Sequence, residues 1–225
     1  MLPLADTAKQ KRPAVVTGLF ITANLAVFAW ELWLGIGESD KMLASFVTEH
    51  ALVAKRLIGH AGDGAQWLTL LTHMFMHGGV AHVLGNMWFL WIFGRPVEDR
   101  LGPVKYFLFY LLAGAAAAVA QIVVDPGATV PMVGASGAIS GVLGAYLLLF
   151  PTAWVLALVP WIVPVLPVPA VIFLVLWFAF QMWSGLGALA AGLEGGVAWW
   201  AHAGGFIAGA AMIWWAKRAR LVRKK

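Results

Sequence analysis

Long apolar runs separated by short polar stretches recur along the 225 residues of the chain. A helix needs about 20 predominantly apolar residues to cross a bilayer, and several of the runs approach or reach that length. The pattern predicts an all-α, polytopic membrane protein with six membrane-spanning helices, of which the fourth is short for a full crossing. The predicted spans are residues 14–35, 80–93 with an extension over 94–101, 104–124, 136–150, 169–183 and 197–215. Composition agrees, since 62% of the residues are hydrophobic and 11% are charged.

Two further stretches are partly apolar but do not fit a simple span. Residues 151–169 contain several prolines, which remove backbone donors and clash inside a helix. We expect a broken connector at the membrane surface there. Residues 39–79 are long for a loop and carry scattered apolar side chains, so we expect short helices lying in the membrane interface. The membrane domain then covers residues 14–215, with 39–79 as its first loop.

The basic residues favour one side of these spans. Most Lys and Arg residues fall in the N-terminal tail 1–13, in the connection after the second span, and in the C-terminal tail 216–225. Because such residues concentrate on the cytoplasmic side, both tails are predicted to be cytoplasmic in a multi-pass protein of the cell membrane. The C-terminal tail is expected to contact anionic membrane lipids. This distribution accounts for the net charge of +5, so we expect no nucleic-acid partner.

Four polar residues on three of the predicted spans fall at a similar depth. Ser136 begins the fourth span, and His202 lies one to two turns into the sixth. His82 and Asn86 lie near the start of the second span. With the orientation above, all four lie in the outer third of the membrane, where polar residues are costly and tend to mark function. A serine and a histidine at that depth suggest a hydrolytic nucleophile and its general base.

Small residues give two of these helices a way to meet. Glycines recur at a spacing of four in both, which lets transmembrane helices approach closely. They are Gly137 and Gly141 in the fourth span, and Gly205 and Gly209 in the sixth.

The same region offers donors for an oxyanion. The backbone N–H of Ser136 lies at a helix start, and His82 and Asn86 share one face of the second span. Spans two to six carry no Asp or Glu at this depth. The pattern therefore indicates a Ser–His dyad without the orienting carboxylate of a serine triad.

With these residues in view, the chain resembles the rhomboid family of intramembrane serine proteases, in its six-span bacterial form. The resemblance covers residues 67–215. It is carried by Gly134-Ala135-Ser136-Gly137, by His77 to Asn86 with His82 between them, by Ala201-His202 to Gly209, and by Gly94 to Gly102.

The resemblance implies a serine endopeptidase that cleaves transmembrane segments of other membrane proteins. Ser136 would be the nucleophile and His202 the general base. His82, Asn86 and the backbone N–H of Ser136 would form the oxyanion hole. The resemblance implies no metal and no other cofactor.

Two positions depart from the family pattern. Ser140 stands four residues after the nucleophile, where many members have an aromatic residue beneath the catalytic histidine. The orientation of His202 must then come from packing or from a hydrogen bond to Ser140. Trp67 is followed by Leu68, where some members carry arginine, so we expect the first loop to be anchored differently.

Other interpretations of these features stay open. His73 and His77 are spaced like metal ligands but lack the adjacent glutamate of an HExxH site, so a metal site is the weaker hypothesis. Trp177 and Phe180 in the fifth span either face lipid and core or form a gate for substrate, beneath a flexible cap at 185–196. A catalytically inactive rhomboid-like binder of membrane proteins is the alternative function. A transporter is disfavoured because the two halves show no internal repeat.

Overall fold

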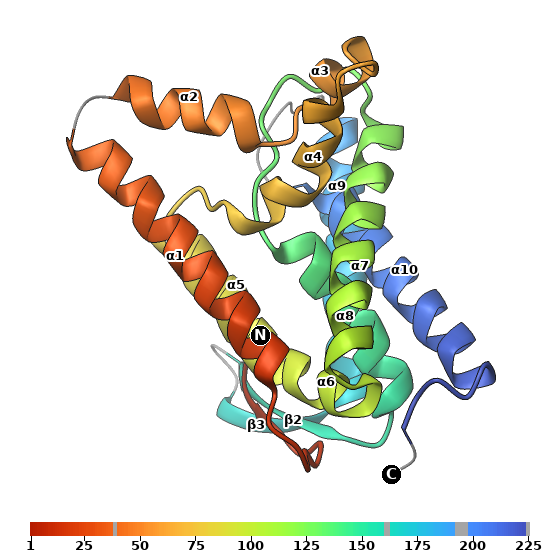
Figure 1. Ribbon diagram of the computed structural model, residues 1–225. Coiled ribbons are helices and arrows are strands. Elements are labelled where there is room, and N and C mark those ends of the chain that lie inside the picture. Colours follow the sequence, from red (N-terminus) through yellow and green to blue (C-terminus); the bar gives the residue numbers. More distant parts are fainter. Residues whose placement is uncertain (38–39, 160–162, 192–197, 224–225) are drawn as a thin grey trace.

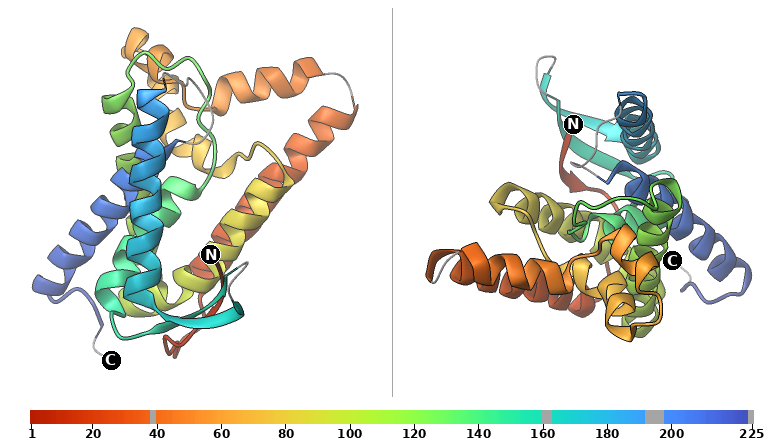
Figure 2. Two further views of the ribbon diagram at one scale, coloured as in Figure 1. Left: turned by 180° about the vertical axis from the view of Figure 1, so that it is seen from behind. Right: turned by 90° about the horizontal axis from the view of Figure 1, so that it is seen from above.

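The computed structural model describes residues 1–37, 40–159, 163–191 and 198–223, most of which form a helical bundle (Figure 1). Its main helices are α1 (Val15–Gly37), α5 (Val80–Phe89), α6 (Arg95–Leu101), α7 (Pro103–Val124), α8 (Ser136–Leu149), α9 (Ala170–Ala190) and α10 (Trp199–Arg218). A π-helical segment, η2 (Leu90–Gly94), joins α5 to α6. The helices α1 and α5 run side by side along one flank of the bundle (Figures 1 and 2).

Three helical segments of the described residues are long and apolar enough to cross a membrane. They are Val15–Gly35, Pro103–Val124 and Ala170–Ala190, with mean hydropathies of 1.7, 2.2 and 1.7. These helices identify the chain as a membrane protein. Each of the other predicted spans also contains helix. Of these helices, α8 is apolar but has only 14 residues, fewer than the roughly 20 that a helix needs to cross a membrane. The predicted total of six crossings is therefore not confirmed.

The centre of the bundle is α8, which packs against both α7 and α10 and is buried along most of its length. Small residues line these contacts. A β-carbon added at Gly141 would lie 2.5 Å from the β-carbon of Ala113 and 3.2 Å from the carbonyl oxygen of Gly205. One added at Gly209 would overlap the backbone of Gly141. The backbones of α8 and α10 therefore touch, an approach that glycine permits and larger residues prevent.

A three-stranded sheet lies at one end of the bundle, so the all-α prediction is wrong there (Figure 1). The strands are β1 (Leu2–Asp6), β2 (Trp154–Val159) and β3 (Val163–Pro169), antiparallel in the order β1-β2-β3. The connector over residues 151–169, expected to be broken, thus contains the hairpin of β2 and β3. The N-terminal tail supplies β1, which pairs with the other edge of β2. Prolines lack the N–H that a central strand must donate, so they are tolerated on edge strands. Both outer strands contain proline, and the central strand β2 contains none.

The stretch between α1 and α5 forms short helices at the opposite end of the bundle (Figure 1). They are α2 (Asp40–His50), α3 (Ala54–Gly59), α4 (Gly64–Thr72) and the 3-10 turn η1 (His73–Phe75). Leu52 and Met132 exchange backbone hydrogen bonds of 3.2 and 2.8 Å. The short helices thereby hold the loop that leads into α8. Their predicted position in the membrane interface stays a prediction.

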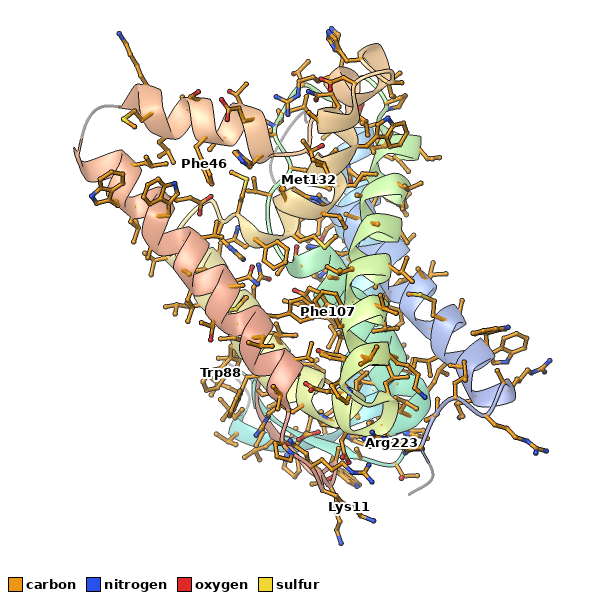
Figure 3. The ribbon with its side chains drawn as sticks, viewed as in Figure 1. Lys11, Phe46, Trp88, Phe107, Met132 and Arg223 are labelled. Carbon is orange, nitrogen blue, oxygen red and sulfur yellow. The ribbon has the colours of Figure 1, made fainter. Side chains whose placement is uncertain are left out.

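Basic segments from distant parts of the sequence gather at the end that carries the sheet. Lys11 and Arg223 lie together there (Figure 3). Arg223 N–H donates to the carbonyl oxygen of Arg100 at 2.8 Å, and Arg100 Nε donates back to that of Arg223 at 2.9 Å. Charge counting grouped the same segments on one side of the membrane, and the cytoplasmic location of that side stays a prediction.

One buried carboxylate ties this end of the bundle together. Glu98 in α6 is 2% exposed, and its Oε1 accepts the N–H of Val16 at 2.9 Å. Its Oε2 accepts the N–H and the hydroxyl of Thr17 at 2.8 and 2.7 Å. Because the first N–H groups of a helix have no partner within the helix, Glu98 caps α1 from a distant part of the chain.

Candidate active site

Ser136 and His202 meet in the interior of the bundle. Ser136 is the first residue of α8, and His202 lies in the first turn of α10. Ser136 Oγ and His202 Nε2 are 2.7 Å apart, although the residues are 66 positions apart in the sequence. A hydroxyl can donate to an imidazole nitrogen at this distance, which lies within the range expected for a nucleophile and its base. The pair can therefore pass a proton from serine to histidine.

Gly137 and Gly205 lie immediately beside this pair. Gly137 follows Ser136, and Gly205 is three residues after His202 on the next turn of α10. A β-carbon at Gly205 would overlap the carbonyl oxygen of Gly137 and lie 3.2 Å from the β-carbon of Ala117. The absence of a side chain at Gly205 therefore lets α10 approach the backbone of α8 beside the serine and the histidine.

The second ring nitrogen of His202 also has a partner. Its Nδ1 lies 2.7 Å from Oε1 of Gln181, a residue of α9. The expectation that Ser140 could orient the ring through a hydrogen bond is wrong. Ser140 Oγ donates instead to the carbonyl oxygen of Ser136 at 2.7 Å, as a helical serine often does one turn back.

Sequence reasoning missed Gln181. Its signal was an amide inside an otherwise apolar predicted span, the kind of residue that tends to mark function at membrane depth.

Gly134 brings two further polar side chains close to the nucleophile. Its φ of 122° is a conformation that residues with a side chain rarely adopt. A β-carbon there would also lie 2.8 Å from the His82 ring and 3.6 Å from Nδ2 of Asn86. Glycine thus allows the loop before Ser136 to press against α5. Asn86 is 8% exposed, and its Nδ2 has no hydrogen-bond partner within the described part of the chain.

His73 supports this loop from the other side. Its carbonyl oxygen accepts the N–H of Gly134 at 2.9 Å, and its Nδ1–H donates to the carbonyl oxygen of Thr69 at 2.8 Å. Burial lowers the pKa of His73 to about 4, so the ring is neutral at pH 7. His77 packs edge-on against the His82 ring, with centroids 5.1 Å apart. Across the described ranges, no three His, Cys, Asp or Glu side chains form a group suited to a metal ion.

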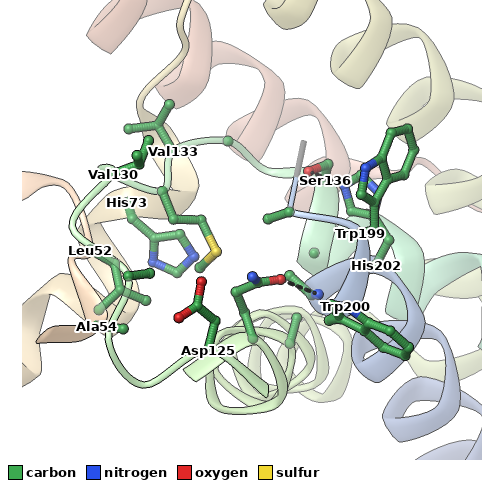
Figure 4. A pocket seen from close by; sticks show the side chains of 18 of the residues that line it. Leu52, Ala54, His73, Asp125, Val130, Val133, Ser136, Trp199, Trp200 and His202 are labelled. Carbon is green, nitrogen blue, oxygen red and sulfur yellow. Dashed lines mark hydrogen bonds between the residues drawn. The ribbon is translucent and has the colours of Figure 1, made fainter. Parts of the chain in front are cut away.

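A cavity of about 610 Å³ adjoins the serine and histidine. Its lining includes Ser136, His202, His82, Asn86 and His73. Figure 4 shows Ser136 and His202 at one side of it, and His73 across from them. At about 30 Å³ per molecule, the cavity has room for roughly 20 waters. The site can therefore hold both water and an extended piece of polypeptide.

Two aromatic residues of α9, Trp177 and Phe180, differ in how far they are exposed. The Trp177 ring is 6.2 Å from the His202 ring and 6.1 Å from that of Phe206, so it packs beside the histidine. Phe180 is 58% exposed and meets Trp199 edge-on at 5.9 Å. A gate at these residues stays a prediction. The expected cap at 185–196 extends into residues 192–197, which lie outside the described residues.

Comparison with known proteins gives the family. A family model, the rhomboid domain, matches residues 64–219, more than half of the chain. The chain is 35% identical over 132 residues to Rhomboid protease GluP of Bacillus subtilis, covering 58% of this chain and 24% of that protein. It is 31% identical over 127 residues to Rhomboid-related protein 3 of Homo sapiens, covering 56% and 30%. It is 30% identical over 157 residues to mitochondrial Rhomboid protein 1 of Saccharomyces cerevisiae, covering 68% and 42%. The chain spans less than half the length of each of these relatives. The stretch that matches the family model contains the serine, the histidine and their polar neighbours, and by this match the chain belongs to the rhomboid family.

Proposed function

We propose that the chain is an intramembrane serine endopeptidase that cleaves transmembrane segments of membrane proteins. Ser136 is its nucleophile and His202 its general base. The observation that carries the proposal is the 2.7 Å contact between Ser136 Oγ and His202 Nε2, beside a cavity with room for water. Relatives named as rhomboid proteases support it independently.

The proposed reaction begins when Ser136 Oγ attacks the carbonyl carbon of the scissile peptide bond. His202 Nε2 takes the hydroxyl proton as the new C–O bond forms and the carbonyl electrons move onto oxygen. The tetrahedral oxyanion collapses, the C–N bond breaks, and the imidazolium donates its proton to the leaving nitrogen. Water, deprotonated by His202, then hydrolyses the acyl ester and regenerates Ser136.

The oxyanion is stabilised by donors that converge beside Ser136. We assign this role to the backbone N–H of Ser136, to Nδ2 of Asn86 and to His82. The first N–H groups of α8 have no partner within the helix, and Asn86 Nδ2 is unpartnered in the described chain. One preorganised donor of this kind contributes about 2.7–4 kcal/mol to transition-state stabilisation. No step requires a metal or another cofactor.

The orientation follows from the basic residues. We propose that the chain lies in the cell membrane with both termini in the cytoplasm and the basic segments near anionic lipids. The sheet end then faces the cytoplasm, and the short helices α2 to α4 face outward. Substrate segments reach the cavity from within the membrane.

The test uses purified protein in detergent and a model substrate with a single transmembrane segment. The unmodified chain should cut it, whereas Ser136→Ala and His202→Ala should not. Ser45→Ala and His60→Ala, at exposed residues that do not line the cavity, serve as matched controls and should cut normally. Equal cleavage by Ser136→Ala would overturn the mechanism.

A second measurement separates a protease from an inactive rhomboid-like binder. A fluorophosphonate should label Ser136 in the unmodified chain and fail to label Ser136→Ala. If the unmodified chain is neither labelled nor active, the proposed function is wrong and the inactive binder becomes the better hypothesis.

A further inference from the structure

Gln181 stands out because it is a polar residue where α9 is otherwise apolar. It is 6% exposed, and it is the one amide in the helix. Its Oε1 lies 2.7 Å from Nδ1 of His202, on the side of the ring opposite Ser136. One imidazole thus bridges two side chains from different helices, and each ring nitrogen has a single polar partner among the described residues.

The chemical identities of these two partners determine which ring nitrogen of His202 carries the proton. A neutral imidazole carries one N–H, and the other nitrogen accepts. An amide oxygen can only accept, so Nδ1 must carry the proton. Nε2 is then left with its lone pair toward Ser136 Oγ. This is the tautomer that a general base needs in order to take the serine proton.

The neighbours of Gln181 along α9 hold it in place. Trp177, Gln181 and Gly185 are spaced four apart, so they lie on one face of the helix. Trp177 packs its ring near His202. A β-carbon at Gly185 would lie 3.1 Å from that of Trp199 and 3.3 Å from the Trp200 ring, so the helix sits tightly on α10 there. The amide therefore lies between the packed Trp177 ring and the close contact of Gly185 with the Trp199 and Trp200 side chains.

We propose that Gln181 is a positioning residue that holds His202 in the base-competent tautomer and orientation. This inference rests on the proposed protease function. Gln181 takes the place of both the carboxylate of a serine triad and the aromatic residue that Ser140 replaces.

A neutral amide suits this environment. A buried carboxylate facing a neutral imidazole would leave a charge without a full partner, which is costly away from water. The amide accepts the same hydrogen bond without that cost. It also stabilises the imidazolium less than a carboxylate does, so its main contribution is orientation rather than charge.

The first test reads the tautomer directly and needs no catalysis. Protein labelled with ¹⁵N in histidine is studied in detergent micelles at neutral pH, and the His202 signals are assigned by their loss in His202→Ala. The unmodified chain should show Nδ1–H and an unprotonated Nε2. Gln181→Leu should shift the population toward Nε2–H. An unchanged tautomer in Gln181→Leu would overturn the proposal.

Gln121→Leu is the matched control. Gln121 in α7 is also an amide that contacts α10, but its Oε1 accepts the backbone N–H of Ala201 at 3.2 Å and not the imidazole. This variant loses a bond between helices without touching the ring, so the tautomer should persist. An equal shift in both variants would show a general loosening of α10 and would overturn the specific role of Gln181. If Gln181→Leu fails to fold, Gln181→Met replaces it.

The second test is kinetic. Gln181→Leu should lower kcat by about 10- to 100-fold with little change in KM, because the lost interaction acts on proton transfer and not on substrate binding. Gln181→Glu keeps an acceptor and should recover part of kcat. Its added negative charge favours a protonated His202, so the acid limb of the kcat/KM profile should move to higher pH. Identical rates and pH profiles for the Leu and Glu variants would overturn the role of the acceptor.

The two proposals fail in different ways. If the unmodified chain is inactive and Ser136 is not labelled, the protease function is wrong, and the tautomer experiment still decides whether Gln181 sets the ring. If the chain is active and Gln181→Leu keeps both kcat and tautomer, the positioning role alone is wrong.

Discussion

The contact between Gly205 and Gly137 predicts that one added methyl group will separate the serine from the histidine. Gly205 lies one turn below His202, and Gly137 follows Ser136, so any displacement at this contact is passed to both residues. In Gly205→Ala the new β-carbon would overlap the carbonyl oxygen of Gly137. That atom belongs to a helix backbone and cannot rotate away, so the helices themselves must move apart.

The displacement can be estimated from contact distances. A carbon and a carbonyl oxygen approach to about 3.3 Å, so α8 and α10 must separate by roughly 1 Å. The Ser136 Oγ to His202 Nε2 distance is 2.7 Å and would rise beyond the hydrogen-bond range. A misplacement of about 1 Å lowers activity by about 100-fold. Overpacking of this kind also costs about 1–3 kcal/mol of stability.

The assay combines cleavage of a single-span substrate with unfolding in an SDS titration. Gly205→Ala should lower kcat/KM by about 100-fold while the protein still folds. Gly18→Ala is the matched control, because Gly18 lies near the start of α1 and a β-carbon there would have no atom from another element within 4 Å in the described part of the chain. It should keep its activity and gain about 0.4–1 kcal/mol of stability. Wild-type kcat/KM in Gly205→Ala would refute the argument that close packing sets the serine–histidine distance.

Two predictions concern the end of the bundle that carries the sheet. Glu98→Ala leaves two N–H groups and one hydroxyl at the start of α1 without their acceptor, and should lower the free energy of unfolding by about 2–4 kcal/mol. Exposed Glu49→Ala is its control and should change stability by less than about 0.5 kcal/mol, so equal losses in an SDS titration would contradict the capping role. Burial raises the pKa of Asp6 above its ordinary value of 3.8, and the Tyr146 hydroxyl donates to its carboxylate. Because the folded chain holds this proton more tightly, its stabilising contribution is present at low pH and lost as pH rises through the raised pKa. Unfolding midpoints should therefore show wild type losing stability relative to Asp6→Asn as the pH rises from below 3.8 through the raised pKa, and a difference that does not vary with pH would contradict this.

The helices could be predicted from hydropathy, whereas the sheet could not. Five prolines in 151–169 correctly excluded a continuous helix, but the sequence contained no signal that residues 2–6 would supply a partner strand. That pairing joins positions about 150 residues apart and depends on where the bundle places the start of α1. Once β1 is known to pair with β2, the proline positions are explained, because Pro164, Pro167 and Pro169 fall on the outer strand β3 and none falls on β2, which can then donate on both sides.

For the site, the depth of the residues in the membrane could be predicted from the sequence, but the directions of their side chains could not. Charge counting and hydropathy placed Ser136 and His202 at a common depth, and glycine spacing gave their helices a way to touch. Neither method reports how a helix is rotated about its own axis. That rotation decides which polar neighbour of His202 reaches its ring. Ser140, Gln121 and Gln181 are all polar residues on helices around α10, and only packing distinguishes them: Ser140 turns back to its own helix, Gln121 binds backbone, and Gln181 meets Nδ1. The departure at Ser140 leaves the orientation of His202 to another group, and we propose that this group is Gln181, on α9 where that helix packs against α10.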